Sequence, residues 1–267
     1  SGGLRYTEDE KDASASVSEA IGTVYSSDNW DEVTWEIASN YTFENGMTGY
    51  ATIQSGYQSG QYPARPYCLF GDIECFVASD NITAVNYEVG IKGRVNEYFD
   101  VSVAVFNTDF DDLPYQVSKV TENGVETDNQ IVTQTSRGIE LDTTFNYGNF
   151  SMMASVAYMD VDVDEQDGYK PVAPLTPDLT LAIGPSYTFD LEGGDSIRVR
   201  ADYSYRSDMY GEPSSLASRQ TELDSRELVN VDIAYTPADD AYTVALYGRN
   251  IFDERYDNAR LNTGDYI

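Results

Sequence analysis

The chain has 267 residues and a formal net charge of −30, with 46 acidic against 16 basic residues and no histidine. A surface that binds nucleic acid needs clustered Lys and Arg, so this charge argues against a nucleic-acid partner. The lack of histidine excludes a Ser-His-Asp hydrolase, a Cys-His protease, and zinc or haem held by histidine. The excess of acidic residues fits either a chain with large, solvated acidic loops or a salt-adapted organism whose proteins are acidic in general. The 22 tyrosines suit a membrane interface, which is apolar on one side and wet on the other.

Apolar and polar residues alternate with a period of two along much of the chain, which predicts β-strands. In 196–206, for example, apolar residues stand at the odd positions from 197 to 205, and polar or charged residues at the even ones. About eleven strands are expected, in chain order at 2–8, 29–43, 47–57, 83–95, 99–110, 131–145, 150–160, 176–189, 196–206, 226–235 and 241–250. Many of these approach or exceed the 9–11 residues that a tilted strand needs to cross a bilayer.

The connections between these strands alternate between short and long. The short ones are 44–46, 96–98, 146–149, 190–195 and 236–240. The long ones are 9–28, 58–82, 111–130, 161–175 and 207–225. Outer-membrane barrels have short periplasmic turns and long external loops, so this alternation predicts an antiparallel transmembrane β-barrel. A soluble sandwich has no reason to place every long loop at one end.

Cys68 and Cys75, in the stretch CLFGDIEC, are the two cysteines of the chain. Two cysteines so close together in a loop favour a disulfide in an oxidising compartment, with two free thiols as the alternative. A zinc site fits less well, because the spacing is not that of a zinc motif and no histidine is present.

Asp160, Asp162 and Asp164 begin like a calcium loop, but Glu165 stands where an EF-hand needs glycine. The stretch is either a loose Ca²⁺ site at the outer rim or a solvated strand end, and no metal site is assigned. Neither a nucleophile motif nor a cleft with paired carboxylates is indicated, so we expect no enzyme activity and no cofactor.

Seven stretches give the chain a resemblance to a known family. They are GLRYTEDEK (3–11), YATIQSGYQSG (50–60), NYEVGIKG (86–93), FNTDFDDL (106–113), SRGIELDTTF (136–145), RADYSYRSD (200–208) and NIFDERY (250–256). In their order and spacing they resemble the C-terminal half of the TonB-dependent receptors, almost end to end. The resemblance implies a parent barrel of about 22 strands with a plugged lumen. Residues 1–267 are then the C-terminal half of that barrel, without the plug domain and the last strand.

The resemblance also implies a function: uptake across the bacterial outer membrane of a scarce solute such as a ferric siderophore, cobalamin or an oligosaccharide. The expected partners are TonB, a plug domain, outer-membrane lipid and the small-molecule ligand. Polar-face residues that could meet the plug or the solute are Glu88, Lys92, Arg94, Arg198 and Arg200. They could equally be ordinary lumen-facing residues, and no ligand-binding residue is assigned. The alternatives are a passive porin and a secreted acidic adhesin.

Overall fold

The computed structural model describes residues 1–18, 22–62, 76–121, 124–165, 170–213 and 221–260, and these ranges contain strands and no helix. The described residues therefore contain no helix that could span a membrane. Eleven strands form one antiparallel sheet. In sheet order they are β1 (Gly2–Ser18), β2 (Gly22–Thr42), β3 (Thr48–Gln58), β4 (Ile82–Asn96), β5 (Phe99–Thr121), β6 (Gly124–Tyr147), β7 (Phe150–Val163), β8 (Leu179–Asp190), β9 (Ser196–Arg206), β12 (Arg226–Thr236) and β13 (Val244–Gly248).

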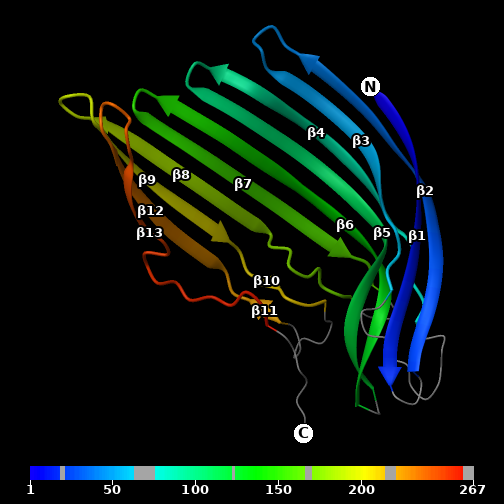
Figure 1. Ribbon diagram of the computed structural model, residues 1–267. Helices are drawn as coiled ribbons and strands as arrows, with labels where there is room; N and C mark the ends of the chain where they lie inside the picture. Colours follow the sequence, from blue (N-terminus) through cyan, green and yellow to red (C-terminus); the bar gives the residue numbers. More distant parts are fainter. Residues whose placement is uncertain (19–21, 63–75, 122–123, 166–169, 214–220, 261–267) are drawn as a thin grey trace.

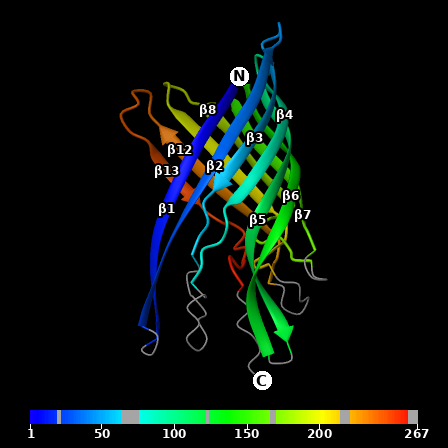
Figure 2. The ribbon, with the colours of Figure 1, turned by 90° about the vertical axis from the view of Figure 1, so that its right-hand side faces the viewer.

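The sheet curves into part of a barrel that does not close, with β1 and β13 as its two edges (Figures 1 and 2). The turns between β2 and β3, β4 and β5, β6 and β7, β8 and β9, and β12 and β13 lie at one end, here called the turn end. The longer connections lie at the other end, here called the loop end. A second sheet at the loop end pairs β10 (Met209–Tyr210) with β11 (Glu222–Leu223). The expected partial barrel of about eleven strands is confirmed.

The convex face of the sheet is apolar. Val89 pairs with Val105, Val105 with Ile139 and Ile139 with Tyr158, so one row of apolar side chains crosses four strands. Leu4 at the β1 edge leaves 82% of its surface exposed, and large apolar residues are exposed on this face over most of the sheet. Such a surface is stable in hydrocarbon and not in water. The apolar faces of the strands therefore point out of the barrel. The alternation in the sequence alone does not tell which of the two faces points outward.

Aromatic side chains gather in pairs at the turn end. Five pairs have ring centroids between 4.6 and 6.5 Å apart: Tyr41 with Phe43, Tyr98 with Tyr147, Phe145 with Phe150, Tyr187 with Phe189, and Tyr235 with Tyr242. Aromatic rings of this kind mark the level at which a barrel wall leaves the hydrocarbon and enters the headgroup region. The turn end thus carries its own membrane-interface belt.

Two of the expected long loops are wrong in part. Residues 9–18 and 22–28 continue β1 and β2, which remain paired to Ser18 and Gly22. Likewise β5 and β6 remain paired from 113 to the tip of their hairpin at Thr121 and Gly124. Beyond the membrane a hairpin needs only its backbone ladder, and its side chains can be polar on both faces. Hydrophobic alternation therefore does not reveal these extensions.

A β-bulge divides β5 into two parts. The register shifts between Phe110 and Leu113, and Asp112 has a φ of 60°, in the left-handed region that Asp tolerates better than most residues. Two residues of β5 here oppose one of β6, so side chains that follow the bulge change faces. Leu113 comes to the same face as Phe110, opposite Val132.

Smaller differences concern strand ends. The strand expected at 176–189 begins at Leu179, after Pro177, which cannot donate a ladder hydrogen bond. The strand expected at 241–250 is shorter, at Val244–Gly248. The connection expected at 207–225 contains β10 and β11.

Candidate functional site on the concave face

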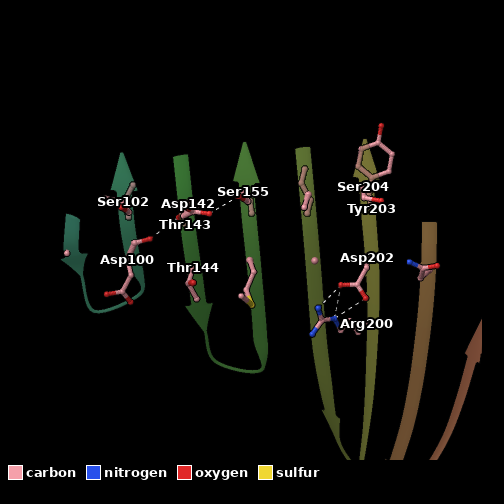
Figure 3. Close-up of a pocket in the computed structure, with 18 residues that line it drawn as sticks. Asp100, Ser102, Asp142, Thr143, Thr144, Ser155, Arg200, Asp202, Tyr203 and Ser204 are labelled. Atoms are coloured by element: carbon pink, nitrogen blue, oxygen red, sulfur yellow. Dashed lines mark hydrogen bonds and ion pairs between the residues drawn. The ribbon is translucent and has the colours of Figure 1, made fainter. Parts of the chain in front are cut away.

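A hollow of about 500 Å³, lined by both polar and apolar side chains, lies on the concave face between β4 and β12 (Figure 3). Its polar lining comes from alternate positions of the strands, so neighbouring strands contribute side chains in register. These residues are Asp100, Ser102, Asp142, Thr144, Ser155, Arg200, Asp202, Ser204 and Asn230. The hollow offers carboxylates, hydroxyls and one guanidinium, which suits a polar partner that binds by hydrogen bonds.

Arg200 and Asp202 form the charged pair of the hollow. The Nε and Nη2 atoms of Arg200 donate to Oδ1 of Asp202 at 2.9 and 2.6 Å. Gly184, on the facing strand β8, leaves room for the pair, because a Cβ there would lie 2.9 Å from Asp202 Oδ1. Both side chains keep about two fifths of their surface exposed, so the pair contributes at most about 1 kcal/mol to stability. Its role is to fix the direction of the guanidinium (Figure 3).

Carboxylates on β5 and β6 form the other side of the hollow. Asp142 accepts a hydrogen bond of 2.7 Å from Ser155 on β7, and Asp100 accepts one of 3.2 Å from Arg94 on β4. Together with Asp202 these groups outnumber the single guanidinium of the lining. The hollow is therefore a net negative surface, which favours contact with cationic or hydrogen-bond-donating groups.

A second polar group lies on β3 and β4. The phenol of Tyr50 donates a hydrogen bond of 2.8 Å to Glu88, and the ammonium of Lys92 lies 5.3 Å from the centre of the Tyr50 ring. Gly90 is the cross-strand partner of Tyr50, and a Cβ at Gly90 would lie 2.6 Å from the ring. Glycine thus allows the ring to lie flat against the wall, held by a carboxylate on one side and a cation on the other.

All five polar-face residues singled out in the sequence lie on the concave side. Glu88 and Lys92 belong to the Tyr50 group, Arg94 binds Asp100, and Arg200 binds Asp202. The remaining one, Arg198, forms an ion pair of 3.4 Å with Asp232 on β12.

Sequence reasoning missed Tyr50, Asp142 and Ser155. All three occupy polar-face positions of alternating strands, so the period of two carries the signal that would have found them.

At the loop end, residues that are distant in sequence pack over the β1–β2 hairpin. Trp30 leaves 8% of its surface exposed, and the Tyr62 ring lies 6.5 Å from it and 5.1 Å from Phe76. Lys11 donates to the carbonyl of Gly60 at 2.7 Å. Most of the buried apolar residues of the described ranges lie at this end, so the core of the structure is in the external part and not in the wall.

The acidic stretch at the end of β7 is held by cations. Arg137 pairs with Asp160 at 2.9 Å, and Lys170 pairs with Asp162. The hydrogen bond and the charge of Asp162 raise the pKa of Lys170 above its ordinary value. These ion pairs neutralise part of the negative charge of the stretch for which the sequence left open a loose Ca²⁺ site or a solvated strand end. Within the described ranges, no group of three or more His, Cys, Asp or Glu side chains is placed to hold a metal ion. Cys68 and Cys75 lie outside the described residues.

Family membership follows from the match of residues 1–251 to the model of the TonB dependent receptor-like β-barrel family. The chain belongs to this family. No curated protein matches the sequence of this receptor chain. Its fold is similar to the ferric yersiniabactin uptake receptor FyuA from Yersinia pestis, with a TM-score of 0.81 and 15% identity over 99% of this chain and 39% of that one.

Two further solved structures show the same fold. The ferric-catecholate import receptor Fiu from E. coli K12 has a TM-score of 0.71 and 15% identity, over 98% of this chain and 39% of Fiu. The copper transporter OprC has a TM-score of 0.68 and 15% identity, over 96% of this chain and 40% of OprC. The receptor chain thus spans about two fifths of the length of these relatives.

Membership places the receptor wall in the outer membrane of Gram-negative bacteria, and the family consists of receptors and transporters. The turn end, with its aromatic belt, is then periplasmic, and the loop end faces the outside. The apolar convex face lies in lipid, and the hollow faces the lumen.

Proposed function

We propose that this chain is the C-terminal half of the barrel of a receptor that imports a scarce solute with energy delivered through TonB. A ferric siderophore is the first candidate among the solutes considered. The observation that carries the proposal is a lumen wall of polar side chains, combined with the fold shared with FyuA and Fiu, which are named for ferric yersiniabactin and for ferric catecholate. OprC, named for copper, also shares the fold, so other solutes remain candidates.

The polar wall serves two partners in this proposal. A plug domain from the rest of the parent protein occupies the lumen, and the hollow at Asp142 and Asp202 meets its polar side chains. Many such contacts together hold the plug at rest. Because each hydrogen bond or ion pair contributes little, the contacts can break one after another under force. The loop-end layer around Trp30 and Phe76 belongs to the surface that captures the solute.

The test is uptake by cells that carry the full-length parent. Iron-starved cells are supplied with radioactive iron bound to a panel of siderophores, with and without the parent gene, and with and without TonB. We expect uptake of at least one complex that needs both. Uptake that needs the parent gene but not TonB would identify a passive porin instead. Recovery of the parent protein without detergent, from a soluble fraction, would favour the secreted adhesin.

A further inference from the structure

Two arginines face each other across strands at the loop end of the lumen wall. Arg206 ends β9 and Arg226 begins β12, and the two are direct register partners. They stand on the same face as Arg200 and Asp202, so their side chains belong to the lumen side. On β8 the next partner in the row is Thr180. On β12, β9 and β8 the row therefore holds two cations and a hydroxyl, and the first carboxylate along it, Glu140 on β6, lies three strands from Arg206.

Neither arginine is neutralised by a carboxylate within the described ranges. Arg206 donates to the carbonyl oxygens of Ser207 and Asp224 at 3.0 and 2.9 Å. The guanidinium of Arg226 lies over the Tyr256 ring, 4.6 Å from its centre. Three of the other described lumen-side arginines, Arg94, Arg198 and Arg200, each pair with an aspartate instead.

This arrangement is unfavourable for the empty protein. Like charges directly opposite each other on neighbouring strands destabilise a sheet. The chain has 46 acidic residues for 16 basic ones, so a carboxylate partner would be easy to place. Instead, two backbone carbonyls hold Arg206, and an aromatic ring holds Arg226. Both supports orient a guanidinium and leave its positive charge in place. An anion between the two side chains would turn the repulsion into attraction.

We propose that Arg206 and Arg226 form a binding site for the carboxylate groups of an anionic solute. The inference rests on the proposed function and names the chemical class of its solute. The contact with the Tyr256 ring joins the Arg226 guanidinium to no carboxylate, so within the described ranges its N–H groups can donate to a ligand. Arg206 has five N–H donors, and two of them go to the backbone carbonyls. A carboxylate accepts two parallel N–H bonds from one such fork, so two arginines fit a solute with more than one carboxylate.

Calorimetric titration of the purified full-length receptor in detergent at low ionic strength tests the site. The probe is tricarballylate, a small tricarboxylate, and the control probe is its uncharged triamide. We expect tricarballylate to bind and the triamide not to bind. Arg226→Gln should weaken the binding on the order of tenfold, and Arg226→Lys, which keeps the charge without the fork, should fall between. Arg137→Gln, which removes the same charge from an ion pair on the convex side, should bind like the wild type.

Three results would overturn the site: no heat from tricarballylate at millimolar concentration, equal affinity of wild type and Arg226→Gln, or equal weakening by Arg137→Gln. A gel shift on heating checks that each variant is folded. Because the titration uses no energised membrane, it separates the two proposals. Uptake that does not need TonB would remove the proposed transport mechanism and leave the binding result standing.

Discussion

The contact between Tyr50 and Gly90 predicts a strong coupling between two positions of the lumen wall. In Gly90→Ala, the new Cβ would lie 2.6 Å from the Tyr50 ring, so the ring must move away from Glu88, to which it donates a hydrogen bond. Overpacking of this kind costs about 1–3 kcal/mol, and replacing a strand glycine by alanine returns about 0.5–1 kcal/mol. We expect a net loss of about 1–2 kcal/mol in the free energy of unfolding.

Replacing Tyr50 removes the ring that the new Cβ would meet. In a Tyr50→Leu background the ring is gone, so Gly90→Ala should be neutral or slightly stabilising. Gly56→Ala is the matched control, because a Cβ at Gly56 meets only the Ala84 Cβ, at an ordinary distance of 3.8 Å. The wild type, Gly90→Ala, Tyr50→Leu and the double variant form a double-mutant cycle. Urea titration of each full-length receptor in lipid vesicles, read by its mobility on unheated gels, gives the four free energies of unfolding. A coupling energy below about 0.5 kcal/mol would refute this account of the wall.

Three further predictions follow from the wall and the loops. Cys68 and Cys75 should form a disulfide that adds about 2–3 kcal/mol of constraint, so alkylation under denaturing, non-reducing conditions should leave the mass unchanged, and labelling of both thiols would contradict it. Val105→Arg, in the apolar row, should destabilise the receptor by about 2–4 kcal/mol in vesicles, whereas Ser102→Arg on the lumen side of the same strand should cost much less; equal costs would reverse our assignment of the two faces. Residues 1–267 expressed alone should form inclusion bodies, because β1 and β13 are open edges, and a monodisperse fragment with channel activity in planar bilayers would disprove this.

The sequence predicts the wall well and the external part poorly. In the wall, each strand has one apolar and one polar face, so the period of two locates it; the strand expected at 196–206 has those bounds in the structure. The bulge at Asp112 breaks the period of two along β5, so the alternation does not predict that the strand continues beyond it. The contacts between site residues, such as that of Tyr50 with Glu88, could not be predicted, because they depend on the register between β3 and β4.

The bulge in β5 separates two regions that receive different support from the rest of the sheet. The pairing of β5 with β4 ends at Asp111, and the pairing of β6 with β7 ends at Gln134. Beyond these points the hairpin is a ribbon of two strands that hold only each other, and the nine residues from Leu113 to Thr121 reach about 30 Å outward at roughly 3.3 Å each. A ribbon of this kind is only marginally stable in water by itself. We therefore expect substitutions, insertions and deletions at its tip to leave the wall intact, so this hairpin can vary its outer surface without loss of the barrel.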